Sequence, residues 1–251
     1  MTGQFENLVI EISAATHRGL VRDRNEDAVS VNREMLAGRR EAKIEFLREG
    51  PDHLLMIADG MGGHARGEIA SSRALEFIHN HETPFDVLEW QRLIREANNE
   101  LYDFMLKRPE TIGMGTTLVG VAIRAEGVMC FNVGDSRAYL HRSGTLNLMS
   151  HDDVPDVKGE IRKRSHQITQ SLGGRSARTQ VFPHVRTHPA LRYGETILLC
   201  SDGLTDMISE ERLEEHLSKQ NDPSECVEYL LNEALDQGGV DNISIVIARM
   251  R

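Results

Sequence analysis

The amino-acid sequence predicts an α+β fold in which two central, mostly antiparallel sheets are stacked and flanked by helices. Two patterns lead to this prediction. Short apolar runs typical of strands follow one another as in hairpins, and segments with helical periodicity occur in separate blocks. The 251 residues contain no internal repeat, low-complexity stretch or linker, so we expect a single domain over residues 1–251.

The predicted strands are short runs of apolar residues, some of which alternate with polar residues. Residues 8–16 show this alternation most clearly, since their apolar residues lie two positions apart. Ser143-Gly144 is typical of a hairpin turn. The predicted strands cover residues 8–16, 28–32, 54–58, 113–123, 128–133, 137–141, 196–200 and 243–248.

The predicted helices have apolar residues that recur every three or four positions and therefore lie on one face. The longest covers residues 86–107, and we expect Asp86 to cap its N-terminus. Shorter helices are predicted over residues 67–80, 209–219 and 223–236.

Two polar stretches have less regular patterns. Residues 33–51 are rich in charge, and their apolar residues Ile44 and Leu47 lie three positions apart. We interpret this stretch as an inserted loop or surface helix without a catalytic part. Residues 150–180 are irregular and contain a basic cluster. The cluster consists of Lys158, Arg162, Lys163 and Arg164, with His166 beside it.

The composition narrows the class of protein. A net charge of −10 argues against general nucleic-acid binding, which depends on neutralising phosphates. The three cysteines show no spacing typical of disulfides or zinc sites. We find no signal peptide at the N-terminus and no apolar run long enough to insert into a membrane. We therefore expect a cytoplasmic protein.

Acidic residues gather at the ends of the predicted strands. Neighbouring antiparallel strands place the end of one beside the start of the next. Pairing of the strand after Glu26 with the strand before Asp59 brings these two acids to one edge. Asp202 and Asp241 share an edge if their strands also pair. The acids at strand ends are Glu26, Asp27, Asp59, Asp135, Asp202 and Asp241.

Carboxylates that converge in this way repel one another, and a bound cation or a proton relieves the repulsion. Oxygen ligands without a nearby Cys or His pattern favour Mg²⁺ or Mn²⁺ over zinc. Two such ions can activate a water molecule as a nucleophile and stabilise a transferring phosphoryl group. Arg22, four residues before Glu26, is suited to bind a phosphate with two hydrogen bonds.

Each of these residues also has a simpler interpretation. Asp-Gly and Asp-Asn pairs are common in turns and caps, which would account for Asp59, Asp202 and Asp241. Asp135 could cap the bend that follows it, and a lone Arg22 could be a solvated charge. Their joint occurrence at several strand ends favours a site.

Six segments of the chain combine acidic residues or glycines with the predicted strand ends: 22–27 (RDRNED), 59–64 (DGMGGH), 113–117 (GMGTT), 134–137 (GDSR), 201–204 (SDGL) and 241–244 (DNIS). In this order they resemble the motifs of the metal-dependent Ser/Thr protein phosphatases of the protein phosphatase 2C-like (PPM) family, in its compact bacterial form. The resemblance spans almost the whole chain and implies a four-layer α/β/β/α sandwich. It also implies hydrolysis of phosphoserine and phosphothreonine by a metal-activated water, without a phosphoenzyme.

The resemblance implies a role for each acid. Asp59 would bridge two metal ions, and Gly60 would contribute its carbonyl oxygen. Asp202 and Asp241 would complete the protein ligands of one ion, and Glu26 would bind the other.

Two further acids match supporting positions of the family. Asp27 would stand close to the metal ligands without binding an ion directly. Asp135, together with Asp202, matches the acids that hold a third ion in bacterial members. The resemblance therefore implies two to three Mn²⁺ or Mg²⁺ ions per chain.

The substrate-binding residues follow from the same resemblance. Arg22 would bind the phosphate, and Gly62 and Gly63 would leave room for the substrate. Animal members use a histidine after this segment as a general acid. His64 is the nearest match, and a hydrogen-bonded turn residue is an equal alternative.

Residues 150–180 fall where bacterial relatives carry a flap beside the site, and this flap is shortened here. We expect its basic cluster to attract anionic phosphoproteins, with a solvated helix face as the alternative. By resemblance, the opposing enzyme is a bacterial Ser/Thr kinase in a signalling pathway. Its targets, including an FHA protein, would be the substrates of a monomeric phosphatase.

Two rival functions remain at this stage. The first is a catalytically silent module of the same fold that binds a ligand or partner. The complete set of acids and Arg22 argues against it, because a silent relative does not need them. The second is another two-metal hydrolase, such as a nuclease, against which the negative charge argues.

Overall fold

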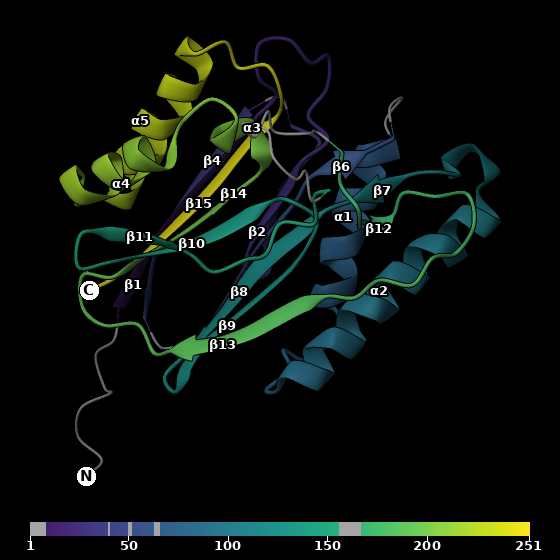
Figure 1. Ribbon diagram of the computed structural model, residues 1–251, viewed down its shortest axis with the longest axis horizontal. Coiled ribbons are helices and arrows are strands. Elements are labelled where there is room, and N and C mark those ends of the chain that lie inside the picture. Colours follow the sequence, from purple (N-terminus) through teal and green to yellow (C-terminus); the bar gives the residue numbers. More distant parts are fainter. Residues whose placement is uncertain (1–8, 40, 50–51, 63–65, 156–166) are drawn as a thin grey trace.

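The computed structural model describes residues 9–39, 41–49, 52–62, 66–155 and 167–251. These residues form four layers, with two sheets in the middle and helices on both outer faces (Figure 1). The arrangement confirms the predicted α/β/β/α sandwich. All described strand pairings are antiparallel, as expected for strands that follow one another in hairpins.

The first sheet has the strand order β11-β10-β14-β15-β1-β4. Its centre joins the two ends of the chain, because β1 pairs with β15 over eight positions, from Ile10 opposite Met250 to His17 opposite Ile243. Its strands are β1 (Val9–His17), β4 (Glu41–Glu49), β10 (Arg137–Arg142), β11 (Thr145–Leu148), β14 (Thr196–Cys200) and β15 (Ile243–Met250).

The second sheet has the strand order β13-β9-β8-β5-β2-β3. Its strands are β2 (Ala28–Val31), β3 (Glu34–Ala37), β5 (His53–Ala58), β8 (Leu118–Arg124), β9 (Gly127–Val133) and β13 (His184–Pro189). A small third sheet is formed by β6 (Gly60–Met61), β7 (Gly115–Thr116) and β12 (Leu172–Gly173).

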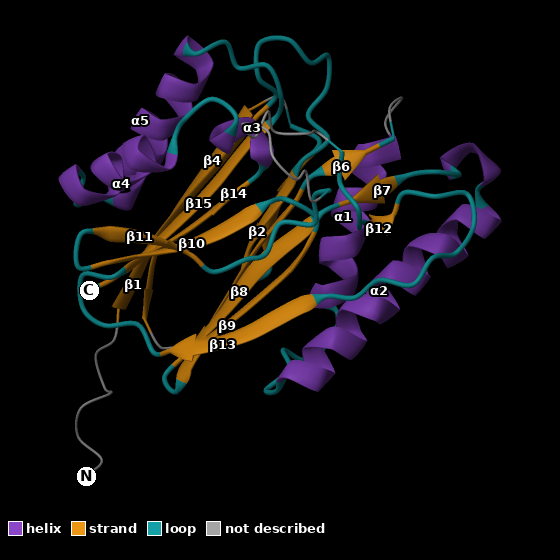
Figure 2. Ribbon diagram, in the orientation of Figure 1, coloured by secondary structure: helices purple, strands orange, loops and turns teal. Residues whose placement is uncertain are grey.

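Helices cover the outer face of each sheet (Figure 2). On the second sheet lie α1 (Arg66–His79) and α2 (Val87–Lys107), followed by a short 3₁₀ turn, η1 (Pro109–Thr111). On the first sheet lie α4 (Glu210–Lys219) and α5 (Pro223–Asp236), preceded by the short α3 (Asp202–Thr205). Asp86 caps α2 as predicted, since its Oδ1 accepts the Glu89 N–H at 2.8 Å. Among the described helices, none is both long and apolar enough to span a membrane.

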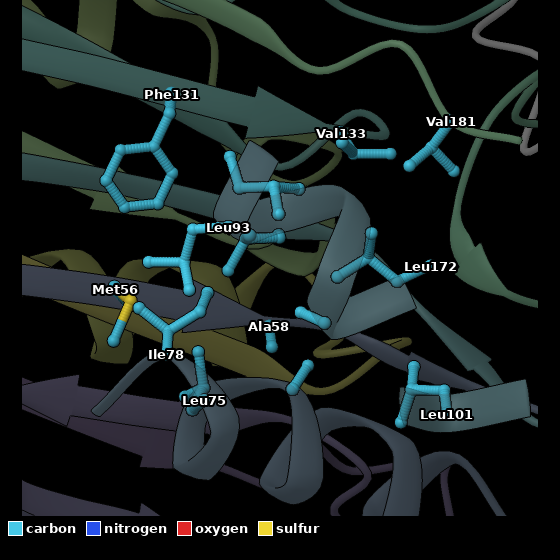
Figure 3. Close-up of a cluster of buried hydrophobic side chains, with 14 of the residues drawn as sticks. Met56, Ala58, Leu75, Ile78, Leu93, Leu101, Phe131, Val133, Leu172 and Val181 are labelled. Carbon is cyan, nitrogen blue, oxygen red and sulfur yellow. The ribbon is translucent and has the colours of Figure 1, made fainter. Parts of the chain in front are cut away.

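Three apolar cores hold the layers together. Strand β5 lies between two of these cores. Because side chains alternate between the two faces of a strand, residues 54–58 must all be apolar. Leu55 and Ile57 pack between the sheets, whereas Met56 and Ala58 pack toward α1 and α2. Phe131 and Met56 both belong to that outer core (Figure 3), and the centroid of the Phe131 ring lies 4.1 Å from that of the stacked Trp90 ring. The third core lies between the first sheet and α4 and α5.

The prediction for residues 33–51 is wrong. This stretch contains β3 and the nine-residue β4, which pairs with β1 along its whole length at the edge of the first sheet. The sequence Ala42-Lys43-Ile44-Glu45-Phe46 alternates with the period of a strand, and the three-residue spacing of Ile44 and Leu47 obscured it. Abundant charge is common on edge strands, where it discourages pairing with other chains.

Candidate active site

The strand pairings bring the predicted acids to one end of the sandwich. Ala28 of β2 lies opposite Ala58 of β5, so that Asp27 and Asp59 adjoin at the ends of these strands. In the first sheet, β14 pairs with β15 up to Cys200, just before Asp202. Asp241 precedes β15 at the same end. Both strand pairings expected from the sequence are therefore confirmed.

Asp59 is held in place by the threonines of residues 113–117. Its N–H donates to Thr117 Oγ1 at 3.0 Å, and its carbonyl oxygen accepts from Thr117 N–H and Thr116 Oγ1, both at 2.9 Å. Thr117 Oγ1 in turn lies 2.7 Å from Ser136 Oγ, in the segment that carries Asp135. The conformation of Asp59 is thus set by backbone contacts, which leave its carboxylate for other partners.

The electrostatic environment of Asp59 is that of a crowded acidic site. Burial raises the pKa of its carboxyl well above the usual value. Three neighbouring carboxylates raise this pKa further because each adds a like charge. These neighbours are Asp27, Asp202 and Asp241. Four acids from separate segments therefore interact at one point.

Asp27 lies beneath this cluster and is fully buried. Its Oδ2 accepts hydrogen bonds from Ser201 Oγ at 2.9 Å and Ser244 Oγ at 2.6 Å. Its Oδ1 is buried and has no hydrogen-bond donor among the described residues. Burial raises the pKa of Asp27 to about 7, although the two serines oppose the shift. A cation near the site would stabilise the ionised form.

Glu26 is positioned mainly through its backbone. Its N–H donates to Asn242 Oδ1 at 2.8 Å, and its carbonyl oxygen accepts from Ser71 Oγ at 2.6 Å. Burial raises the pKa of the Glu26 carboxyl, which Arg22 and the backbone of Gly67 partly counteract. The side chain is half-buried at the edge of the acidic cluster.

Asn242 is a positioning residue to which the sequence assigned no role. Its Nδ2 donates to the carbonyl oxygens of Arg18 and Arg24, each at 2.8 Å. Together with its bond to Glu26, these contacts hold the loop that carries Arg22 against the segment that carries Asp241. Its place inside the matched segment 241–244 was the available signal, as it was for Ser244, whereas Ser201 begins the matched segment 201–204.

Close backbone approach explains why Gly60 and Gly67 are glycines. A Cβ on Gly60 would lie 2.3 Å from the Gly67 carbonyl oxygen and 2.5 Å from that of Glu26. A Cβ on Gly67 would lie 2.8 Å from the Glu26 carboxylate. The absence of side chains lets β6, the start of α1 and Glu26 meet, which places the Gly60 backbone beside the acids.

Asp135 extends the acidic cluster toward the second sheet. Burial, and to a smaller extent the charge of Asp202, raises the pKa of its carboxyl to about 7. Asp152 and Asp206 contribute smaller effects of the same sign. Asp135 therefore lies within electrostatic range of Asp202.

Arg22 reaches the cluster from an exposed loop. Its Nη2 donates to Asp241 Oδ2 at 2.5 Å, while 57% of its side chain remains exposed. This hydrogen bond raises the pKa of Arg22, and the charges of Asp241, Asp59 and Asp202 add to the effect. A guanidinium in this position can hold the acids on one side and meet an incoming anion on the other.

The chemistry of these residues fits divalent cations that prefer oxygen ligands. The carboxylates raise one another's pKa, and the Asp27 Oδ1 atom is buried without a donor in the described part of the chain. A bound cation would relieve both costs. The residues suited to ligate it are Glu26, Asp59, Asp135, Asp202 and Asp241, with the carbonyl oxygen of Gly60.

Of the remaining predicted site residues, Gly62 is the one that lies within the described part of the chain. Gly62 is exposed beyond β6 and has a φ of 130°, which a glycine adopts readily. Gly63 and His64 lie outside the described residues. The same holds for the basic cluster of the predicted flap, which consists of Lys158, Arg162, Lys163 and Arg164, and for His166.

Comparison with known proteins agrees with this geometry. A family model described as Protein phosphatase 2C matches residues 43–237. The chain is 35% identical to the serine/threonine protein phosphatase PstP of Mycobacterium tuberculosis, over 96% of this chain and 45% of that protein. The chain thus spans about half the length of that relative. It is 31% identical to the serine/threonine phosphatase stp of Listeria monocytogenes, with 92% of each covered.

A solved structure also resembles this one. The catalytic domain of PstP in complex with two manganese ions superimposes with a TM-score of 0.78 and is 33% identical in sequence. The match covers 97% of this chain and 99% of that domain.

Proposed function

The chain belongs to the protein phosphatase 2C family, and from this membership we propose that it hydrolyses phosphoserine and phosphothreonine in proteins with bound Mn²⁺ or Mg²⁺. The observation that carries the proposal is the environment of Asp59. Its pKa is raised by burial and by three further carboxylates, and the exposed guanidinium of Arg22 lies at the same cluster. Carboxylates that can bind divalent cations, next to an exposed guanidinium that can bind an anion, are suited to the cleavage of a phosphate ester.

We assign the metal ligands by the position of each acid. Asp59, at the centre of the cluster, and the carbonyl oxygen of Gly60 would hold the two ions. Asp202 and Asp241 would be the further protein ligands of one ion, and Glu26 would be a ligand of the other. When bound, the ions neutralise the phosphoryl group and lower the pKa of a water so that it acts as the nucleophile.

The residues around the ligands have distinct tasks. Asp27 lies beneath the ligands. The hydrogen bonds that Ser201 and Ser244 donate to its Oδ2 stabilise its negative charge and so weaken its repulsion of the neighbouring carboxylates. Arg22 orients the phosphate while Asp241 prevents its guanidinium from turning to solvent. Asp135, near Asp202, is suited to hold a third ion. Gly62 and Gly63 leave space for the phosphorylated side chain, and His64 is the proposed proton donor.

The physiological setting remains part of the proposal. A Ser/Thr kinase and its targets are the expected source of substrates, and an FHA protein is one candidate among them. We propose that the domain acts as a monomer in the cytoplasm. The basic cluster of residues 158–164 would attract phosphoproteins toward the otherwise acidic chain.

The direct test is hydrolysis of an aryl phosphate and a phosphothreonine peptide. We expect turnover of both with Mn²⁺, none with EDTA, and near-background turnover by Asp202→Asn. Asp52→Asn is a matched control, because Asp52 is exposed just before β5, at the opposite end of that strand from Asp59. It should retain full activity.

The same assay separates the rival functions. Absence of metal-dependent turnover, or full activity in Asp202→Asn, would contradict the proposal and favour a silent binding module. Cleavage of single- or double-stranded DNA at a rate comparable to that of the peptide would instead favour a nuclease.

A further inference from the structure

A second group of potential metal ligands lies beside the acidic centre. His151, Asp153 and His184 each offer one ligand atom, and these atoms all lie within 4.8 Å of one another. We propose that these three residues bind one zinc-class ion, at a site distinct from the carboxylate cluster around Asp59. The proposal does not depend on phosphatase activity.

The two histidines are positioned by a single residue, Asn132 of β9. His184, the first residue of β13, lies opposite Asn132 in the second sheet. The Asn132 side chain also brackets the backbone of His151, since its Oδ1 accepts the His151 N–H at 3.0 Å and its Nδ2 donates to the His151 carbonyl oxygen at 2.7 Å. The loop after β11 and the edge strand β13 are thereby brought together.

The carboxylate of Asp153 is held in a fixed orientation by hydrogen bonds to both of its oxygens. It is buried, with 6% of the residue exposed. Its Oδ2 accepts the Gly134 N–H at 2.9 Å, and its Oδ1 accepts from Gln170 Nε2 at 2.8 Å. Hydrogen bonds to the carboxylate and backbone of metal ligands set the direction of their lone pairs. A buried carboxylate also needs a positive partner.

In the absence of a metal ion, His184 is a hydrogen-bond partner of this carboxylate. Its Nε2 donates to Asp153 Oδ1 at 2.9 Å. A metal ion would take the place of the proton between these two atoms, and the proton would leave to solvent. The remaining bonds of Asp153 to Gly134 and Gln170 do not involve that proton and can stay in place.

Two imidazoles and one carboxylate favour a particular class of ion. Zn²⁺, Co²⁺ and Ni²⁺ accept imidazole nitrogen, whereas Mg²⁺ requires oxygen ligands. The donor set equals that of open zinc sites with three protein ligands. This distinguishes the cluster from the all-oxygen set around Asp59.

Binding of an ion by all three residues requires the His151 ring to turn. Zinc ligands lie ~2.0–2.2 Å from the ion, so that their donor atoms are about 3.3 Å apart in a tetrahedral site. The rings of His151 and His184 stack with centroids 4.4 Å apart and planes at 23°, whereas an ion must lie near the plane of each ring. His151 is exposed and can turn its ring without displacing core side chains.

Zinc stoichiometry in excess magnesium tests the site. The full chain is equilibrated with Zn²⁺ in millimolar Mg²⁺, passed through a desalting column, and analysed for bound zinc. We expect His151→Ala and His184→Ala each to hold one zinc per chain fewer than the parent protein. His188→Ala, on the same strand β13 and outside the cluster, is the matched control and should retain the parent stoichiometry.

The ligands and the separation of the two sites are checked independently. Zinc-edge X-ray absorption of Asp59→Asn, in which the carboxylate centre is impaired, should still show scattering from two imidazoles. His151→Ala should lose that signal.

Two results would overturn the proposal. One is equal zinc content in the parent, His151→Ala and His188→Ala proteins. The other is bound zinc without imidazole scattering. Because His151 is exposed, its substitution leaves the fold intact even if His184→Ala destabilises it, and circular dichroism verifies this.

Discussion

The side chain of Asn242 holds the backbone of Glu26, with its Oδ1 accepting the Glu26 N–H at 2.8 Å. Its other amide end binds the carbonyl oxygens of Arg18 and Arg24. One buried amide thus sets the position of a proposed metal ligand and of the loop that presents Arg22. Because Asn242 adjoins Asp241, its side chain connects two sides of the site.

We expect Asn242→Ala to weaken Mn²⁺ binding and to lower activity. Loss of a group that orients a metal ligand typically costs about 10- to 100-fold in affinity or rate. Manganese titration of aryl phosphate hydrolysis measures the shift. Asn147→Ala, on the exposed part of the edge strand β11, is the control and should behave like the parent protein. An unchanged manganese dependence in Asn242→Ala would show that the loop does not need this residue.

Substitution of Arg22 should affect substrate more than metal. We expect Arg22→Lys and Arg22→Ala to reduce kcat/KM for a phosphothreonine peptide by roughly 10- to 100-fold, since a charged hydrogen bond contributes about 1.5–3 kcal/mol. Apparent Mn²⁺ affinity should not fall in Arg22→Ala, because the removal of a positive charge leaves Asp241 more attractive to a cation. Arg92→Ala, in an exposed ion pair on α2, serves as the control. A parallel loss of manganese affinity would indicate that Arg22 mainly organises the acids.

The metal-free protein should become less stable as the pH rises. The pKa of Asp27 and that of Asp135 are about 7 in the folded chain, compared with ~3.9 for an unfolded aspartate. A raised folded-state pKa means that protonation favours the folded state. This contribution is complete below the unfolded pKa and is lost as the pH rises through about 7.

Thermal unfolding in EDTA measures this effect. The midpoint should be lower at about pH 8 than at about pH 6, and Mn²⁺ should raise it most at the higher pH. Asp27→Asn should reduce the pH dependence, whereas the exposed Asp52→Asn should not change it. An Asp27→Asn protein with the full pH dependence would exclude this carboxyl as its source.

Gly67→Ala should destabilise the protein even though alanine favours helices. In an open helix position the change would stabilise by about 1 kcal/mol. Here the added Cβ would lie 2.6 Å from the Gly60 carbonyl carbon and 2.8 Å from the Glu26 carboxylate. Overpacking of this kind costs about 1–3 kcal/mol, and the displacement of Glu26 should also lower Mn²⁺-dependent activity.

Chemical denaturation and manganese titration of the same Gly67→Ala preparation give both values. Glu76→Ala, at an exposed position of α1, controls for helix propensity. A Gly67→Ala protein more stable than the parent would mean that β6 and Glu26 can move apart without cost.

The sequence predicted the elements whose signal is local. The uninterrupted run before Asp59 became β5 because both of its faces are buried, and the cap at Asp86 preceded α2 as expected. Edge strands were harder to predict from the sequence. β4 and β13 carry many charged or polar side chains, because one edge of each faces solvent, and this masks the two-residue period.

The sequence by itself determined which residues can carry the chemistry, because acids at the ends of apolar runs and the six matched segments are local patterns. Only the tertiary structure decided which of these residues meet. Asn242 lies 216 positions from Glu26 in the chain, and His151 and His184 come together at Asn132, which lies in a third segment of the chain. Such contacts depend on register between strands distant in sequence, which is set by the packing of three cores and leaves no trace in local composition.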